Sequence, residues 1–169
     1  MSFKSIAVKD FNDNIFKLIG DEWMLITSGN KNKYNTMTAS WGGAGVLWNK
    51  NVTFSFVRPQ RYTFEFMESN DYYTLSFYDK KYKNALKLCG SVSGRDVDKV
   101  KKIGFCEVFD NDSIYFNEAK LVIICKKIYG QFLDPACFID KSICGLYKNE
   151  DYHKLFIGEI VKVLVKDGE

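Results

Sequence analysis

The sequence has little of two residue types, since it contains one histidine and two prolines among 169 residues. A single histidine, His153, excludes a catalytic network of several histidines, and a lone histidine is more often a surface or loop residue than an acid–base group. Aromatic residues make up 16% of the chain. Together with the scarcity of proline, this content predicts a folded, β-rich domain.

Long apolar runs and concentrated charge are also missing. No apolar run approaches the roughly 18 residues of a membrane span, and the first residues, MSFKSIAVKDF, lack the apolar core of a signal peptide. The formal net charge is +3, and the basic residues are scattered along the chain. These features predict a soluble, cytoplasmic protein that binds neither nucleic acid nor membrane.

The motifs of several enzyme and metal-binding classes are absent as well. No G-x-G-x-x-G follows a strand, and the sequence has no P-loop and no G-x-S-x-G elbow, so dinucleotide-fold, nucleotide-hydrolase and serine-hydrolase functions lack support. The five cysteines form no C-x-x-C pair and have no histidine cluster beside them, so we predict no metal site. We expect most to be reduced, buried thiols, while Cys137 and Cys144 fall in an expected loop and could be reactive.

The chain does contain a series of short runs that are typical of β-strands. They lie at residues 23–29, 35–41, 51–57, 72–78, 113–130 and 154–166. Most are rich in β-branched and aromatic residues, and several alternate with period two, which predicts about six or seven strands.

Runs whose apolar residues have the spacing of a helix are less common than these strand-like runs. The runs 81–90 and 96–105 predict short amphipathic helices, whereas 61–69 fits either a strand or a helix. We expect Asp96 to cap the second of these helices, with Gly94 in the turn before it.

Many strands at short spacing, with few and short helices between them, favour a small β-barrel decorated by helices. The length suits one domain over residues 1–169 that folds without a disulfide or metal. The mouth of such a barrel, or its outer face at a subunit contact, is the natural place for a ligand.

Residues 35–45, NTMTASWGGAG, combine hydroxyls, an amide, a tryptophan and glycines in one short run. Such residues are poor material for a core, but they suit the binding of a flat ligand with polar edges. A plainer interpretation is a solvent-facing edge strand followed by a glycine turn at 42–45.

Four stretches, NTMTASWGG, FVRPQRYT, LSF and SGRDVDK, occur in an order and at spacings that decide between these interpretations. Together they resemble the flavin reductase-like family of FMN-binding split barrels, and in particular its flavoredoxin-like branch. The resemblance extends from about Ile15 to Lys166 and includes the late stretches LDP and DYH. It implies a mainly β fold, an FMN-binding split β-barrel with a few short helices.

The resemblance also implies a set of binding residues. The ring edge and ribityl chain of the flavin would meet Asn35, Thr36, Met37, Thr38, Ala39 and Ser40, with Trp41 beside them. Backbone contacts would come from near Val57 and Arg58, a phosphate contact from Thr63, and a second phosphate-side group from Ser93, Arg95 and Lys99. His153 falls where some relatives place a residue near the flavin. Seen alone, Arg58, Arg61 and Lys99 would be ordinary surface cations.

The function that the resemblance implies is electron transfer through bound FMN, as a flavin reductase-like enzyme or a flavoredoxin-type carrier. The cofactor performs the chemistry in such proteins, so no catalytic triad is needed. NADH, NADPH or a partner protein stay open as electron donors, and members of the family usually form homodimers. The alternatives are an FMN-storage module, a split barrel with another cofactor such as haem or a pyridoxal derivative, and an interaction protein without ligand.

Overall fold

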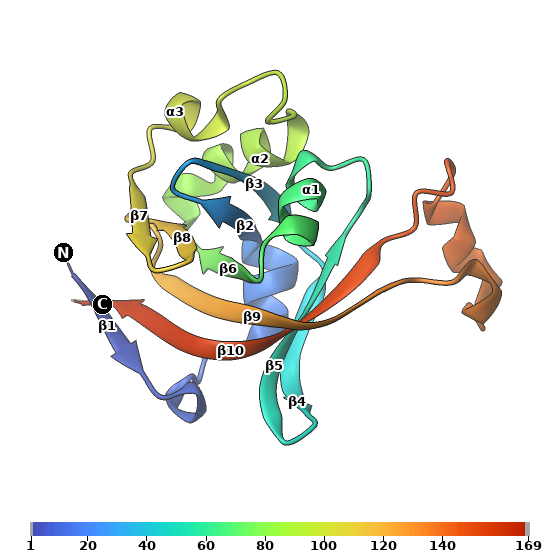
Figure 1. Cartoon of the computed structure of the whole chain (residues 1–169), viewed down its shortest axis with the longest axis horizontal. Helices are drawn as coiled ribbons and strands as arrows, with labels where there is room; N and C mark the ends of the chain where they lie inside the picture. Colours follow the sequence, from blue (N-terminus) through green and yellow to red (C-terminus); the bar gives the residue numbers. More distant parts are fainter. Residues whose placement is uncertain (1, 168–169) are drawn as a thin grey trace.

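The computed structural model describes residues 2–167 (Figure 1). Its strands are β1 (Phe3–Ile6), β2 (Met24–Asn30), β3 (Lys33–Ala39), β4 (Gly42–Leu47), β5 (Lys50–Val57), β6 (Tyr72–Phe77), β7 (Glu107–Asp110), β8 (Ser113–Phe116), β9 (Leu121–Phe132) and β10 (Lys154–Lys166). Its α-helices are α1 (Tyr62–Ser69), α2 (Lys83–Ser91) and α3 (Lys99–Ile103), and shorter helical turns are η1 (Val8–Asp10), η2 (Lys17–Glu22), η3 (Lys80–Tyr82), η4 (Pro135–Cys137) and η5 (Lys141–Leu146). The mainly β composition with few, short helices is confirmed.

Eight strands form one antiparallel sheet, in the order β3-β2-β6-β9-β10-β5-β4, with β1 paired to β10. The two ends of this path, β3 and β4, follow one another in the chain and are joined only by Ser40 and Trp41. The ends of the sheet must therefore meet at this connection, which means that the sheet curves round on itself. The end of β3 and the start of β4 thus lie at the opening of the curved sheet.

The curvature depends on the two longest strands, β9 and β10, which sweep across the molecule in Figure 1. Their pairing shifts register between Ile157 and Gly158 and again between Ile160 and Lys162. Such irregularities bend a strand and increase its twist. At the first shift a Cβ atom on Gly158 would lie 2.4 Å from the Tyr73 hydroxyl, so the bend is packed too tightly for any side chain there.

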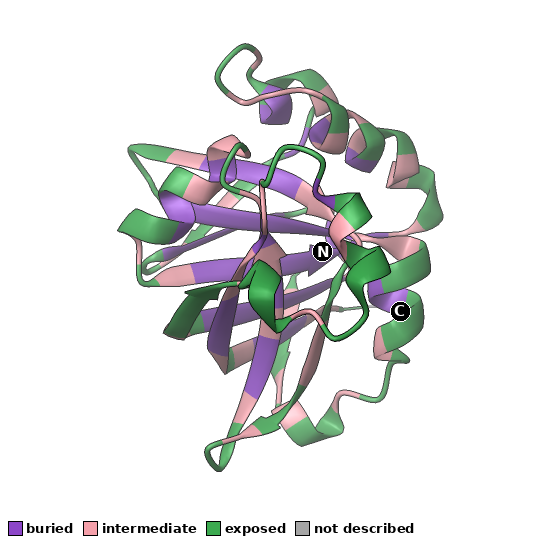
Figure 2. Cartoon of the chain, turned by 90° about the vertical axis from the view of Figure 1, so that its right-hand side faces the viewer, coloured by how far each residue is buried: buried purple, intermediate pink, exposed green. Residues whose placement is uncertain are grey.

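The sheet is buried on both faces along its centre (Figure 2). Successive residues of β2 belong to different apolar clusters, since Met24 and Ile26 pack in one and Leu25 packs in the other. The second cluster also contains Leu86 of α2 and Val100 of α3, so these helices cover the outer face of the sheet. Burial on two faces explains why β9 begins with an unbroken apolar run.

The helix predictions are confirmed, with one correction. The ambiguous run 61–69 forms α1, whose Tyr62 and Phe66 rings contact at 5.1 Å across one turn. The cap of α3 is Asp98, not Asp96, because Asp98 directly precedes the first helical residue and its carboxylate accepts a hydrogen bond from the Lys101 N–H at 3.0 Å. Asp96 lies in the preceding turn, which contains Gly94 as expected.

Several elements have no counterpart in the sequence prediction. These are β1, β4, β7 and the π-helical turn η2, and the plainer interpretation of 42–45 as a glycine turn is replaced by strand β4.

Residues 133–153, here called the arm, connect β9 to β10 and project from the body of the molecule in Figure 1. Only two of the five cysteines, Cys89 and Cys125, are buried, so the expectation that most of them are buried is wrong. Cys106 is exposed, and Cys137 and Cys144 lie in the arm. Among the described residues, no helix is long and apolar enough to cross a membrane.

Candidate functional site

A cavity of about 190 Å³ lies at the opening of the curved sheet. Its walls come from the end of β3, the connection to β4, the end of β5 and the two segments that flank α1 and β10. The lining residues are Met37, Thr38, Ala39, Ser40, Trp41, Phe56, Arg58, Arg61 and His153. Seven of these nine residues were predicted from the sequence as flavin-binding residues, so the fold brings the central part of that set together.

The free edge of β3 faces this region. The Thr36 carbonyl accepts a hydrogen bond from the Lys99 ammonium at 2.8 Å, so it points away from β2, which is the one partner of β3 among the described strands. Because successive residues of a strand direct their backbone groups to opposite edges, the N–H and C=O of Thr38 point to the same free edge as those of Thr36. Thr38 therefore offers one backbone donor and one acceptor to the cavity that it lines.

Arg58 is held at the cavity wall by the arm. Its guanidinium pairs with the Asp151 carboxylate at 2.8 Å and donates to the Leu146 carbonyl at 3.2 Å. Gln60 donates to the same carboxylate oxygen of Asp151, and the Arg58 guanidinium lies 5.1 Å from the Tyr147 ring centre. Arg58 is therefore a fixed positive charge and not a mobile surface cation.

His153 forms another part of the wall. Its ring is buried and lies 5.2 Å from the Trp41 ring, and its Nδ1 atom is 2.9 Å from the Tyr147 hydroxyl. Burial, and then the charge of Arg58, lower the pKa of His153 to about 4, although the carboxylate of Asp151 acts in the opposite direction. The imidazole is thus neutral at pH 7 and acts as a hydrogen-bonding group without charge.

Arg61 lines the first cavity, and Arg61 and Lys99 both donate hydrogen bonds to the last turn of α2. The Arg61 guanidinium donates to the carbonyls of Gly90 at 2.9 Å and Cys89 at 3.4 Å, and the Lys99 ammonium donates to the same Cys89 carbonyl at 3.1 Å. Within residues 2–167 neither cation forms an ion pair with a carboxylate. Burial, and then the charge of Arg61, lower the pKa of Lys99 to about 8.

The predicted phosphate ligand Thr63 lies in the first turn of α1 and is fully buried. Its hydroxyl accepts a hydrogen bond from the Asn35 amide at 2.7 Å, and Asn35 is pressed against Gly94, where a Cβ atom would lie 2.0 Å from the amide oxygen. Thr63 and Asn35 therefore join α1, β3 and the turn before α3. A contact between Thr63 and a phosphate stays a prediction.

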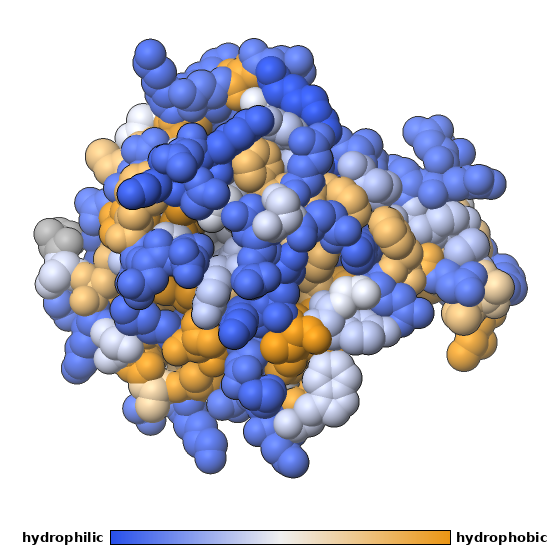
Figure 3. All heavy atoms as spheres, viewed as in Figure 1, coloured by the Kyte–Doolittle hydropathy of each residue, from blue (hydrophilic) through white to orange (hydrophobic). Residues whose placement is uncertain are grey.

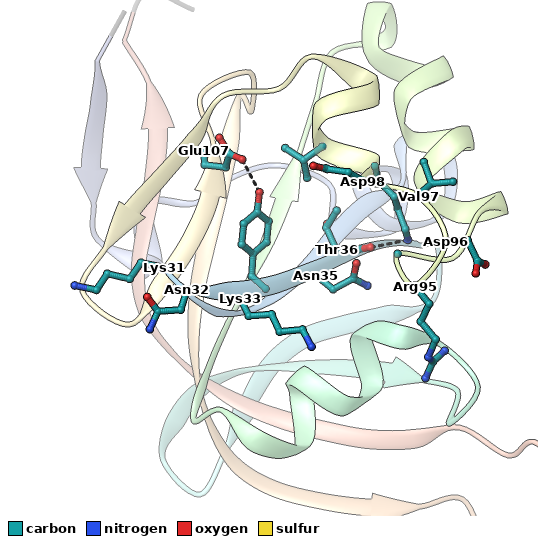
Figure 4. Close-up of a pocket in the computed structure, with 14 residues that line it drawn as sticks. Lys31, Asn32, Lys33, Asn35, Thr36, Arg95, Asp96, Val97, Asp98 and Glu107 are labelled. Atoms are coloured by element: carbon teal, nitrogen blue, oxygen red, sulfur yellow. Dashed lines mark hydrogen bonds between the residues drawn. The ribbon is translucent and has the colours of Figure 1, made fainter.

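The remaining predicted residues divide between a second cavity and the protein interior. The second cavity, of about 410 Å³ (Figure 4), is lined by Asn35, Thr36, Arg95 and Lys99 together with Lys31, Lys33, Tyr34, Asp96, Asp98 and Glu107. Arg95 pairs there with Glu65. Val57 is buried and Ser93 accepts from the Arg95 N–H at 3.2 Å, and neither residue lines either of these two cavities.

Sequence reasoning missed three contributors to the site. Phe56 lines the first cavity, Asp151 holds Arg58, and Tyr147 bonds His153. The position of Asp151 in the DYH stretch was a signal that could have indicated its role. Tyr147 carries no such signal, because it belongs to no recognisable pattern.

The family is decided by sequence comparison. The flavin reductase like domain matches residues 17–169. The chain belongs to this family. A comparison with curated protein sequences gives no match.

Solved structures with a similar fold include three members of related groups. Flavoredoxin of Desulfovibrio vulgaris has a TM-score of 0.67 at 22% identity, over 86% of this chain and 69% of that chain. An FMN-binding domain of a flavin reductases-like enzyme from Shewanella baltica has a TM-score of 0.70 at 16% identity, over 97% and 77% of the two chains. The NADH:FAD oxidoreductase of Streptomyces globisporus has a TM-score of 0.64 at 13% identity, over 87% of this chain and 76% of that chain. These neighbours confirm the predicted split-barrel fold.

Proposed function

We propose that this protein binds FMN and transfers electrons through it, as a flavin reductase-like enzyme or a flavoredoxin-type carrier. The observation that carries the proposal is the pair Arg61 and Lys99, two buried or half-buried cations that share the Cys89 carbonyl and have no carboxylate partner in the described chain. Buried charges in proteins are normally paired, and a phosphate would supply the missing negative charge. The site would thus be completed by an anionic ligand.

The first cavity supplies what the ring of such a ligand requires. A flavin ring has carbonyl and amide edges that must be hydrogen-bonded when they are buried. The free edge of β3 at Thr38, the Ser40 hydroxyl and the neutral His153 offer such groups, and Ala39 leaves room for the ring. Small-molecule pockets usually measure about 300–1,000 Å³. The cavity of about 190 Å³ therefore suits the ring alone, with the phosphate directed toward Arg61 and Lys99.

The chemistry would belong to the cofactor, which accepts and donates electrons when it is bound. The residues of this chain would bind it, orient it and set its surroundings. Burial, and then repulsion by the positive charge of Arg58, lower the pKa of Arg61. Negative charge on a bound ligand would relieve that repulsion, so the site favours an anionic cofactor.

FMN and FAD must be distinguished, since one neighbouring structure is an NADH:FAD oxidoreductase in complex with NAD and FAD fragments. We propose FMN because the unpaired cations next to the first cavity provide for one phosphate. The second cavity contains Asp96, Asp98 and Glu107 beside its basic residues, so it is less suited to a second phosphate. FAD binding tighter than FMN binding would contradict this choice.

The experiment is a titration of the purified protein with FMN, followed by NADH or NADPH without oxygen. We expect a bound flavin spectrum, quenching of tryptophan emission, and loss of the yellow colour when a nicotinamide donor or a reduced partner protein is added. Trp41 lines the cavity and Trp23 and Trp48 do not, so Trp41→Phe should remove most of the quenching. A protein that takes up no FMN would refute the proposal, and one that binds FMN but is never reduced would be a storage module.

We also propose a homodimer. Apolar side chains gather at the end of the arm, where Ile139 is 100% exposed and Leu146 is 54% exposed (Figure 3). Exposed apolar groups on a projecting segment are typical of a protein contact, and a twofold pair is the commonest closed assembly. Light scattering should give twice the chain mass of 19.5 kDa. A monomer that still binds FMN tightly would show that the site needs no partner.

A cytoplasmic location of the protein stays a prediction.

A further inference from the structure

The arm reaches back to the first cavity through Tyr147. Its ring is buried between Tyr152, at 4.8 Å, and Phe138, at 6.0 Å, with the Arg58 guanidinium 5.1 Å from the ring centre. Within residues 2–167 the hydroxyl has one hydrogen-bond partner, Nδ1 of His153 at 2.9 Å. The position of the phenol is therefore fixed by its neighbours, and its hydroxyl is directed at the imidazole.

The protons of this pair can be assigned by counting donors and acceptors. A neutral imidazole has one N–H and one bare nitrogen, and a phenol has a single hydrogen to donate. If Tyr147 donates to Nδ1, the phenol hydrogen and the bare ring nitrogen are both used, and the imidazole proton is on Nε2. The opposite direction would leave the phenol hydrogen without an acceptor in the described chain and would cost the free energy of an unmade hydrogen bond. The first arrangement is favoured.

The Nε2 atom opens into the cavity. No described group bonds it, yet it is not among the enclosed side-chain atoms that lack a partner, which are Ser55 Oγ, Ser76 Oγ, Tyr78 OH and Asp151 Oδ1. An unbonded nitrogen that is not enclosed must be in contact with solvent. Since His153 lines the first cavity next to Trp41, that solvent is the solvent of the cavity.

We infer that Tyr147 is a positioning residue that holds His153 as the Nε2–H tautomer, so that the wall of the first cavity presents a neutral N–H donor to a bound molecule. The group recognised is an uncharged hydrogen-bond acceptor, a carbonyl oxygen or a bare ring nitrogen. Arg58 and Asp151, which pair with one another, are the charged groups that act on the ring, and they act on its pKa in opposite directions. The inference about the bound molecule depends on the proposed function, whereas the tautomer does not.

The single histidine makes a direct test possible, because every imidazole signal in a ¹⁵N spectrum of the full chain comes from His153. At pH 7 the parent should show a protonated Nε2 and a bare Nδ1 whose signal is moved upfield by the hydrogen bond it accepts. Tyr147→Phe keeps the ring but removes the hydroxyl, and it should move the Nδ1 signal downfield toward the value of a free imidazole. Tyr152→Phe removes a neighbouring hydroxyl that does not bond His153, and it should leave the signal in place.

A protonated Nδ1 in the parent would overturn the inference without any variant, so the test does not depend on the folding of Tyr147→Phe. Equal shifts in Tyr147→Phe and Tyr152→Phe would also overturn it, because a general disturbance of the arm would then explain them. Addition of FMN provides the second measurement and should shift the Nε2–H signal of the parent. If FMN binds and this signal does not move, the donor does not face the ligand. If FMN does not bind, the proposed function fails while the tautomer assignment stands on the first spectra.

Discussion

The ammonium of Lys99 lies 2.8 Å from the carbonyl oxygen of Thr36 and is almost completely enclosed, since Lys99 is 4% exposed. A second hydrogen bond to Cys89 uses another of its three donors and leaves one free. Lys99 thus connects the edge strand β3 to the last turn of α2 and still has a donor for a ligand. The same residue lines the second cavity.

The first prediction concerns that remaining donor. Lys99→Ala should weaken FMN binding by about 1.5–3 kcal/mol, the range of a charge-assisted hydrogen bond, because the phosphate loses a cation. Riboflavin lacks the phosphate and should bind the parent and the variant about equally. Lys102→Ala, which removes an exposed lysine from the same helix, should change neither affinity. Equal losses for FMN and riboflavin would mean that Lys99 acts only on the shape of the wall.

The second prediction concerns the bend of β10. In Gly158→Ala the new methyl group would lie 2.4 Å from the Tyr73 hydroxyl and 2.8 Å from Cβ of Cys125, both enclosed in the core. Overpacking of this kind typically costs about 1–3 kcal/mol of unfolding free energy. Gly20→Ala is the matched control, because a Cβ atom there meets nothing within 4 Å. Urea denaturation should separate the two variants clearly, and equal stabilities would show that the bend is not sterically fixed.

The third prediction is a pH dependence of stability. The unfolded chain protonates His153 below its ordinary pKa of 6.5, whereas the folded protein does so only near 4. Between these values the folded state binds fewer protons, so its stability falls as the pH falls. The loss between pH 6.5 and 5 should be at most about 2 kcal/mol, since each pH unit contributes up to about 1.4 kcal/mol.

Carboxylates also titrate in this range, so the measurement compares the parent with His153→Gln. As the pH is lowered from 7 to 5, the parent should lose more unfolding free energy than His153→Gln does, so the gap between the two proteins should change in favour of the variant. A gap that stays constant would mean that the folded protein protonates His153 as readily as the unfolded chain does.

Much of the fold could be predicted because its signals are local. Apolar and β-branched runs indicated most of the central strands, and the spacing in 81–90 indicated α2. Strand β4 was not predicted, because its sequence GGAGVL is poor in residues that favour strands. It forms because β5 pairs with it along its whole length, from Gly42 opposite Ser55 to Leu47 opposite Lys50. Long-range pairing of this kind overrides local propensity.

The candidate site also has a part that local sequence predicts and a part that depends on long-range packing. The run Met37 to Trp41 is continuous in the sequence and stays together in the cavity. The pairs Arg58 with Asp151 and Tyr147 with His153 depend on how the arm folds back, and no local pattern encodes such a return. The burial of Lys99 could not be predicted either, because a lysine on a short helix is normally exposed, and only the packing of α3 on α2 and β3 encloses it.

The last prediction tests whether the end of β3 is the wall that meets the flavin ring. Ala39 lines the first cavity and is partly buried, so Ala39→Leu would fill the space that the ring requires. We expect FMN affinity to fall by about 1–3 kcal/mol or more, the usual cost of overpacking a close contact. The fold should tolerate the change better than the site does, because Ala39 is only partly buried and is the last residue of its strand.

The matched control is Ala44→Leu, which makes the same change on β4, outside the first cavity. FMN absorbance titrations of both variants, with circular dichroism to verify folding, give the comparison. Loss of binding in Ala39→Leu alone would support the assignment of the ring to the cavity between Thr38 and His153. Loss in Ala44→Leu alone would move the ring to the far side of Trp41, where Ile19, Gly43 and Ala44 line a separate apolar cavity. A folded Ala39→Leu protein that binds FMN as tightly as the parent would show that β3 is an ordinary edge strand, since a ring in contact with this wall could not accommodate the larger side chain.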